Sequence, residues 1–298
     1  MTIQEKIQKL KREKNAIILA HNYQLPEVQD IADFVGDSLE LARISAQVKE
    51  EVIIFCGVHF MAETASILAP NKKVILPDLF AGCPLANTIT PEDVKSLKGK
   101  YKNYAVVAYV NTSAKVKAES DYICTSANAI SVVEKIPEEK IIFIPDRNLG
   151  YYVSKHTKKE MIIWNGFCPT HQRILPQDII NLKEKYKDAK VVVHPECRKE
   201  VLDLADKIAS TSGIIKFVKE DDGKRYIIGT EAGLLHRLRK ENPEKEFYLA
   251  SSLAVCPNMK KITLDKILTS LENLEPEVKV EESIRERALK PIERMLNL

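Results

Sequence analysis

Three cysteines stand at matching places in the sequence, and each is followed by proline. These steps are Cys83-Pro84, Cys168-Pro169 and Cys256-Pro257, with cysteine spacings of 85 (168 − 83) and 88 (256 − 168) residues. A single cysteine is more often a small buried apolar residue than a ligand. That interpretation suits Cys56 and Cys124, which lie in or beside strand-like runs. Three matched steps in loops indicate instead that the three thiols bind one shared centre.

An iron–sulfur cluster is the centre that this pattern favours. Zinc bound by three cysteines is an alternative, although no fourth ligand lies near them in the sequence. The chain has no C-x-x-C pair of the kind found in zinc ribbons and common ferredoxins. A [4Fe–4S] cluster held by three cysteines leaves one iron open, and an open iron can act as a Lewis acid toward a hydroxyl or carboxylate. Cys197 is the main rival ligand because it also follows a strand-like run.

Polar residues two positions apart follow an apolar run in each third of the chain. They are His21 and Tyr23, Tyr109 and Asn111, and His194 and Glu196. Residues two apart in an extended chain point the same way, so each pair offers two functional groups on one side. A single histidine is more often structural than catalytic, but His21 and His194 occupy equivalent positions. Glu196 is the best candidate for a carboxylate that exchanges protons with a substrate.

Hydroxyl residues recur before a helical stretch of each repeat. The pairs are Asp37-Ser38, Thr125-Ser126 and Ser210-Thr211. Such residues usually only cap a helix. Three pairs in register predict, in addition, that hydroxyls and helix N-termini bind an anionic ligand such as a phosphate or a dicarboxylate.

These residues require a scaffold of three similar units. Short runs rich in β-branched residues recur in three sets: 16–20, 105–108 and 191–193; 52–55, 141–144 and 226–228; and 74–76, 161–163 and 247–249. Such continuous runs are typical of strands buried on both faces of a parallel sheet. Amphipathic stretches at 31–42 and 201–208 predict helices between the strands.

We therefore predict an α/β protein with a repeat of about 85–90 residues. The expected units are residues 1–86, 87–171 and 172–272. Helices are expected to start seven residues after the cysteines, at Thr90, Leu175 and Thr263. The tail, residues 273–298, is expected to pack as a helix against the first unit, with an interruption or kink at Pro291. If the units meet around a pseudo-threefold axis, the cysteine loops converge on one point.

Composition limits the classes of protein that the chain could represent. It has 298 residues, of which 45% are hydrophobic and 29% charged, which suits two or three folded domains. The net charge of +3 gives no reason to expect a nucleic acid or membrane partner. We see no secretory signal and no apolar run near the length of about 20 residues that a membrane helix needs. We expect a cytoplasmic protein, in which six cysteines are more often ligands, reactive thiols or core residues than disulfides.

Ten stretches spread over nearly the whole chain resemble quinolinate synthases, the iron–sulfur enzymes of NAD biosynthesis. They are residues 19–24, 33–38, 57–63, 109–111, 125–128, 145–150, 168–172, 194–197, 229–231 and 256–260. The resemblance implies three homologous three-layer αβα domains with parallel sheets around a central [4Fe–4S] cluster. It implies condensation of iminoaspartate (iminosuccinate) with dihydroxyacetone phosphate to quinolinate, phosphate and water, with the open iron as Lewis acid for the dehydration. It also implies functional coupling to an L-aspartate oxidase or dehydrogenase.

The resemblance also assigns residues, motif by motif. The implied cluster ligands are Cys83, Cys168 and Cys256. The implied substrate-binding residues are His21, Ser38, Tyr109, Val110, Asn111, Ser126, His194, Pro195, Glu196 and Thr211. Tyr23 and Glu196 are the implied acid–base pair, with Tyr109 and His21 as further catalytic candidates. Four positions depart from the family pattern without removing a ligand: His59 stands for Asp, Gly82 for Thr, Phe167 for His and Ser212 for Gly.

Two alternatives share parts of this pattern. Diphthamide-biosynthesis proteins also take one cysteine from each of three similar domains, but they perform radical chemistry with S-adenosylmethionine. A non-enzymatic iron–sulfur sensor or carrier would lack a polar cleft. The polar pairs at the predicted strand ends favour the synthase.

Overall fold

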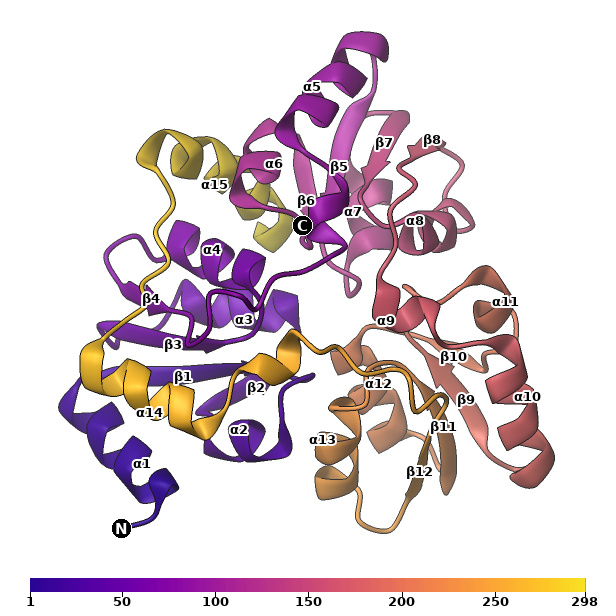
Figure 1. The fold of residues 1–298 in the computed structure, drawn as a ribbon. Helices are drawn as coiled ribbons and strands as arrows, with labels where there is room; N and C mark the ends of the chain where they lie inside the picture. The colour runs from indigo at the N-terminus through magenta and orange to yellow at the C-terminus, as the bar shows by residue number, and fades with distance from the viewer. Residues whose placement is uncertain (298) are drawn as a thin grey trace.

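The computed structural model describes residues 1–297, and within them the strands form three parallel four-stranded sheets. The strand orders are β2-β1-β3-β4, β6-β5-β7-β8 and β10-β9-β11-β12, so the same order occurs three times. Each sheet is flanked by helices, and the three αβα units lie around a common centre (Figure 1). The predicted α/β fold class is confirmed.

The first unit begins with a helix and continues through its four strands. Its elements are α1 (Ile3–Glu13), β1 (Ala16–His21), α2 (Pro26–Ile31), β2 (Phe34–Gly36), α3 (Ser38–Ser45), β3 (Val52–Cys56), α4 (His59–Leu68) and β4 (Lys73–Ile75). Every residue of β3 is buried, which explains why its run VIIFC is apolar throughout and does not alternate.

The second and third units repeat this plan. The second contains η1 (Ala86–Thr88), α5 (Pro91–Lys100), β5 (Ala105–Tyr109), α6 (Ala114–Glu119), β6 (Tyr122–Cys124), α7 (Ala129–Lys135), β7 (Lys140–Ile144), α8 (Arg147–Ser154) and β8 (Glu160–Ile163). The third contains α9 (Pro169–Gln172), α10 (Pro176–Lys185), β9 (Lys190–Val193), α11 (Lys199–Leu202), β10 (Lys207–Ile208), α12 (Thr211–Glu220), β11 (Arg225–Gly229), α13 (Leu234–Glu241) and β12 (Glu246–Leu249). All nine predicted apolar runs are strands in these units.

The two amphipathic stretches do not form single helices as the spacing predicts. Residues 31–42 are split among α2, the edge strand β2 and α3, and residues 201–208 among α11, a turn and β10. The edge strands β2 and β10 have three and two residues, too few to show a period of their own. Asp37 then begins a new helix by accepting hydrogen bonds from the amides of Leu39 and Glu40, both at 3.0 Å.

The predicted helix starts after the cysteines are confirmed. Thr90 is the N-cap of α5, and its hydroxyl accepts a hydrogen bond from the amide of Asp93 at 3.2 Å. Leu175 and Thr263 are the residues that precede α10 and α14 (Leu264–Asn273). Each helix begins eight residues after its cysteine (91 − 83, 176 − 168 and 264 − 256).

The C-terminal part of the chain returns to the first unit and then leaves it. After η2 (Met259–Lys261), helix α14 packs against α1, and the amide of Val278 donates to the carbonyl of Val74 at 2.8 Å. Helix α15 (Glu282–Asn297) then lies mainly along α6 and β6 of the second unit and also contacts α4 (Figure 1). The tail therefore packs against two units, not the first alone, and α15 continues through Pro291 without interruption.

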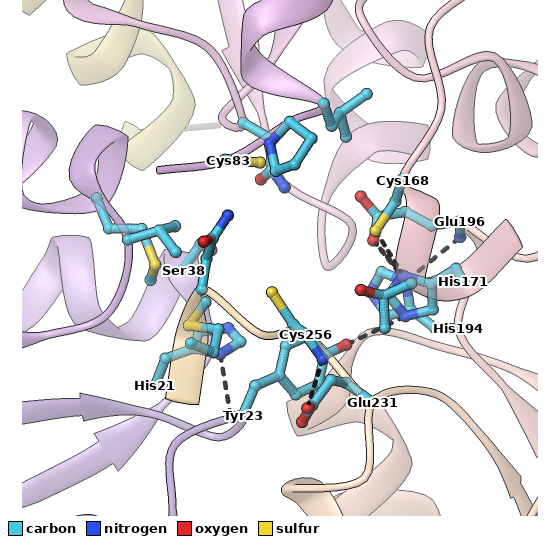
Figure 2. A pocket seen from close by; sticks show the side chains of 18 of the residues that line it. His21, Tyr23, Ser38, Cys83, Cys168, His171, His194, Glu196, Glu231 and Cys256 are labelled. Atoms are coloured by element: carbon cyan, nitrogen blue, oxygen red, sulfur yellow. Dashed lines mark hydrogen bonds and ion pairs between the residues drawn. The ribbon is translucent and has the colours of Figure 1, made fainter. Parts of the chain in front are cut away.

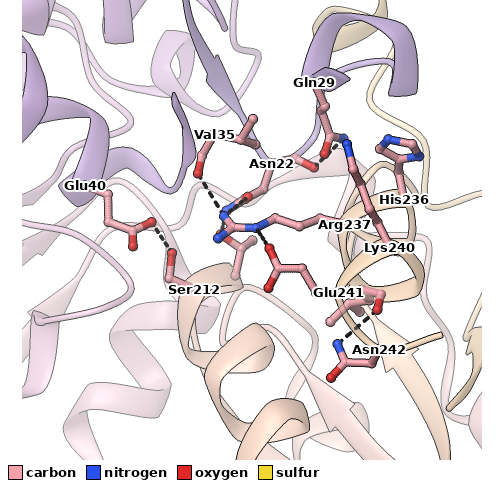
Figure 3. Close-up of polar contacts among 12 residues, drawn as sticks. Asn22, Gln29, Val35, Glu40, Ser212, His236, Arg237, Lys240, Glu241 and Asn242 are labelled. Atoms are coloured by element: carbon pink, nitrogen blue, oxygen red, sulfur yellow. Dashed lines mark hydrogen bonds and ion pairs between the residues drawn. The ribbon is translucent and has the colours of Figure 1, made fainter. Parts of the chain in front are cut away.

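The first and third units meet through polar contacts beside β1 (Figure 3). Arg237 of α13 donates through Nη1 to the side-chain oxygen of Asn22 at 3.0 Å and to the carbonyl of Val35 at 2.8 Å. Gln29 donates to the carbonyl of Gly233 at 2.9 Å. These bonds fix the position of the loop after β1 relative to the third unit.

Across residues 1–297, no helix is both long enough and apolar enough to span a bilayer.

Candidate active site

A cavity of about 190 Å³ lies where the carboxyl ends of strands from all three units meet. In open α/β sheets this end of the strands is where ligands bind. Cys83, Cys168 and Cys256 all line the cavity and approach the same space from three sides (Figure 2). The convergence of the three cysteine loops agrees with the pseudo-threefold arrangement.

Most residues predicted from the strand ends line the same cavity. Besides the three cysteines they are His21, Tyr23, Ser38, Tyr109, Asn111, Ser126, His194, Glu196 and Thr211. Val110 and Pro195 are not among its lining residues. Val110 lies between Tyr109 and Asn111, and Pro195 lies between His194 and Glu196. In an extended segment the side chain of the middle residue points away from those of its two neighbours. Pro195 borders a separate surface pocket beside Lys207.

The three Cys-Pro thiols fit a metal centre and are not joined in disulfides. Burial raises the pKa of Cys83 to about 12, and burial together with the charge of Glu196 raises the pKa of Cys168. Burial likewise raises the pKa of Cys256. Thiolates crowded into one apolar space need a cation to stabilise them, so this donor set suits an iron–sulfur cluster or another soft metal centre.

Cys197 is not a ligand of this site. It is fully buried in the core of the third unit, and its thiol donates to the carbonyl of Gly229 at 3.3 Å. Cys56 and Cys124 are buried in β3 and β6, as the sequence predicts. Cys197 follows a strand, as a ligand of the cavity would, but its side chain points into the core of the third unit and away from the cavity.

His171 is the main site residue that the sequence analysis did not single out. Its Nδ1 atom lies 3.2 Å from Cys168 Sγ and 2.8 Å from Glu196 Oε2, and its Nε2 atom lies 2.9 Å from Thr230 Oγ1. Cys168, His171 and Glu196 could together hold a metal ion. The signal for His171 was present, because it follows Cys168 by three residues at the start of α9, which places the two on one side of the helix.

Glu196 is a buried carboxylate in a basic and hydrogen-bonding environment. Burial opposes its ionisation, but His171, His194 and the hydroxyl of Tyr109 outweigh burial and lower its pKa. It therefore carries a charge at neutral pH. Its Oε1 atom has no hydrogen-bond partner within residues 1–297, so the ionised group retains an acceptor for a ligand.

Two tyrosines beside Glu196 are kept protonated. Burial raises the pKa of Tyr23, and the charge of Glu196 raises it further. The same two causes raise the pKa of Tyr109. The hydroxyl of Tyr23 lies 2.6 Å from Thr230 Oγ1 and 3.4 Å from His171 Nε2. The site thus places neutral phenols next to an ionised carboxylate, which is an acid–base arrangement.

His21 and His194 have the same local geometry in the first and third units. Nδ1 of His21 accepts the amide of Tyr23 at 3.1 Å, and Nδ1 of His194 accepts the amide of Glu196 at 3.3 Å. Burial lowers the pKa of both to about 3. Both imidazoles are therefore neutral at physiological pH, with a proton on Nε2 available for donation. Ser126 Oγ lies 3.1 Å from Nε2 of His194.

The hydroxyl pairs contain capping residues in two of the units. Asp37 and Ser210 are the N-caps of α3 and α12, and Ser38 and Thr211 are the first helical residues. Ser38 and Thr211 line the cavity, and so does Asp37. In the second unit Asn128, not Ser126, precedes α7. In the third pair the capping and ligand interpretations thus apply to different residues, whereas Asp37 of the first pair both caps its helix and lines the cavity.

Comparison with known proteins covers nearly the whole chain. The family described as Quinolinate synthetase A protein matches residues 5–297. The quinolinate synthase of Desulforudis audaxviator is 55% identical over 293 residues, covering 98% of this chain and 97% of its own. That of Thermodesulfovibrio yellowstonii is 55% identical over 295 residues, covering 99% and 97%, and that of Caldicellulosiruptor saccharolyticus is 52% identical over 297 residues, covering 99% and 98%. With three αβα units, a shared cysteine cavity and this similarity along its length, the chain belongs to the quinolinate synthase family.

Proposed function

We propose that this enzyme condenses iminoaspartate with dihydroxyacetone phosphate to give quinolinate, phosphate and water. The observation that carries the proposal is the single cavity in which three thiols, an ionised buried carboxylate and protonated phenols meet. Family membership supports the same reaction, since the relatives compared above are all named quinolinate synthase.

Cys83, Cys168 and Cys256 would hold a [4Fe–4S] cluster. With three protein ligands the cluster would supply an open iron, a Lewis acid for the loss of hydroxide during ring closure. The free thiols suit a reducing compartment, and we place the enzyme in the cytoplasm on that ground.

Glu196 and Tyr23 are the proposed acid–base pair. Elimination of phosphate requires removal of a proton next to a carbonyl, and the ionised Glu196 has an unoccupied acceptor for it. Tyr23 stays protonated and can donate to a developing alkoxide or amine. His171 lies within reach of both and can pass a proton between them.

Neutral donors and hydroxyls are proposed to bind the substrates' anionic groups. Ser38 and Thr211 stand at the N-termini of α3 and α12, where backbone amides and the helix dipole favour phosphate or carboxylate. Asn111 has a buried side-chain oxygen without a hydrogen-bond partner in the described chain, and it also lines the cavity. The proposed binding set also contains His21, Tyr109, Ser126 and His194, which all line the cavity.

An L-aspartate oxidase or dehydrogenase is the proposed supplier of iminoaspartate. The imine hydrolyses in water, so production close to this cavity would favour its use. No nucleic acid or membrane partner is proposed.

An anaerobic assay tests the function directly. Purified protein with reconstituted cluster is incubated with dihydroxyacetone phosphate and with iminoaspartate generated in the same vessel, and quinolinate is measured by chromatography. Wild-type protein should form quinolinate and phosphate in equal amounts, and the Cys168→Ser variant should form neither. Absence of quinolinate from cluster-loaded wild-type protein would contradict the proposal.

A further inference from the structure

Two buried acids occupy equivalent positions next to two of the cluster cysteines. Asp146 follows β7 and Glu231 follows β11, 85 positions apart (231 − 146). Both side chains are 0% exposed. A carboxyl group that is fully buried from solvent needs hydrogen-bond donors from the protein. The identity of those donors indicates the role of the acid.

Each acid accepts a hydrogen bond from the backbone amide of a cysteine. Oδ2 of Asp146 lies 3.2 Å from the amide nitrogen of Cys168. Oε1 of Glu231 lies 3.0 Å from the amide nitrogen of Cys256 (Figure 2). The acid belongs to a strand end and the cysteine to the loop that follows the next strand. The hydrogen bond therefore ties the cysteine loop to the rigid end of the sheet.

The second oxygen of each acid is held as well. Oδ1 of Asp146 accepts the amide of Leu149 at 2.7 Å at the start of α8. Oε2 of Glu231 accepts the amide of Gly233 at 2.7 Å, and Lys260 pairs with the same carboxylate at 3.0 Å. Because both oxygens are fixed, neither carboxylate can turn away from its cysteine without breaking another bond.

The first unit lacks this arrangement. The matching position is Gly57 (146 − 89), which has no side chain. The cysteine loop there is joined to the strand end by a main-chain bond, from the amide of His59 to the carbonyl of Ala81 at 2.8 Å. Phe80 of this loop is 83% exposed, and a Cβ added at Gly82 would meet no atom within 4 Å. The loop that carries Cys83 thus lacks the buried acid that holds the cysteine amide in the other two loops. Lysine side chains hold it further back in the chain instead, since Lys261 donates to the carbonyl of Phe80 and Lys266 pairs with Asp78.

We propose that Asp146 and Glu231 are positioning residues that hold Cys168 and Cys256 in place for cluster binding, while Cys83 is ordered last and completes the ligand set. The inference rests on the proposed cluster function. It adds that the three cysteine loops differ in how firmly the protein holds them before the cluster binds. The sequence repeat alone would predict that the three loops are held equally.

Hydrogen exchange of the full-length protein, measured by mass spectrometry before and after cluster reconstitution, tests the proposal. In cluster-free wild-type protein, peptides that contain Cys83 should exchange about tenfold faster than those that contain Cys168 or Cys256, and cluster loading should remove the difference. Equal exchange in the three loops of the cluster-free protein would overturn the proposal. This measurement needs no variant, so it remains decisive if a substitution impairs folding.

Asp146→Asn and Glu231→Gln provide the matched variants, because each amide keeps the shape of the acid but only one acceptor oxygen. The first should speed exchange only around Cys168 and the second only around Cys256, each by about tenfold, with a lower iron content after reconstitution. Glu244→Gln, at an exposed glutamate, is the control. Unchanged exchange and iron content in both variants would overturn the proposal. If wild-type protein shows the exchange order but forms no quinolinate, only the proposed function fails.

Discussion

Nδ1 of His171 lies 2.8 Å from Oε2 of Glu196, with both side chains buried. This contact links α9, which begins just after Cys168, to the loop that follows β9. Because His171 also lies 3.2 Å from Cys168 Sγ, the proposed metal ligand Cys168 and the proposed base Glu196 are parts of one hydrogen-bonded group. A substitution at either residue should therefore change the hydrogen bonding of the other.

Replacing Glu196 with Gln should abolish most of the activity and leave the cluster in place. The amide cannot accept a proton, and loss of a general base lowers kcat by about 10²–10⁴-fold. The rate of quinolinate formation and the visible absorption of the cluster are measured on the same sample. Glu200→Gln, at an exposed residue four positions away, should behave like wild-type protein. Wild-type activity in the Glu196 variant would refute its assigned role.

Replacing Cys83, Cys168 or Cys256 singly with Ser should prevent stable cluster binding. Each loss removes one of three protein ligands from the same cavity. Cys197→Ser is the internal control, because Cys197 lies in the core of the third unit and should retain full iron content. The measurement is iron and sulfide per chain after anaerobic reconstitution. Full iron content in all three Cys-Pro variants would rule out this ligand set.

Acid should destabilise the protein through the buried histidines His21 and His194. Their pKa is about 3 in the folded protein against 6.5 for an ordinary histidine, so the unfolded chain binds more protons between pH 3 and 6.5. The free energy of unfolding therefore rises with pH in that window and falls on acidification, by about 2 kcal/mol per histidine from pH 6.5 to 5. Urea unfolding at a series of pH values measures it.

His21→Asn should flatten this pH dependence, since asparagine can accept the Tyr23 amide without titrating. The exposed His156 provides the control, and His156→Asn should leave the slope unchanged. An unaltered slope in the His21 variant would show that His21 is not held neutral by the fold.

Replacing Arg237 with Met should raise KM more than it lowers kcat. The guanidinium binds the side chain of Asn22, which lies between His21 and Tyr23, and the carbonyl of Val35 (Figure 3). Its loss loosens the loop after β1 and should destabilise the fold by about 1–3 kcal/mol. Arg239→Met is the control, because Arg239 donates to Phe247 within the third unit. The measurement is kcat and KM of both variants. Equal KM values in the Arg237 and Arg239 variants would argue against a positioning role for Arg237.

The central strands and the convergence of the cysteines could be predicted from the sequence. Val52–Cys56 and its counterparts are buried on both faces, and burial on both faces leaves a continuous apolar run that is visible without a structure. Cys83, Cys168 and Cys256 are spaced by the same repeat as the strands. Once the strands are recognised as equivalent, the three cysteines are therefore expected at equivalent places in the fold.

Other features depended on three-dimensional packing. The edge strand Lys207–Ile208 is too short to leave a pattern, and its apolar residue fitted a helical spacing equally well. Asp146 and Glu231 look like ordinary loop acids until their burial beside the cysteine amides is seen. The position of α15 across two units is likewise set by tertiary contacts with α6 and β6 and not by any local signal.

The return of α14 to the first unit has a consequence for how the protein is made. Domains usually fold in order as the ribosome releases them, the N-terminal one first. Here the first sheet emerges early, but the helix that packs against α1 begins only at Leu264. The first unit therefore stays unfinished until α14 has been synthesised, after the strands of all three units. The three thiols come together no earlier than this, so the proposed cluster would be loaded after all three units have been made.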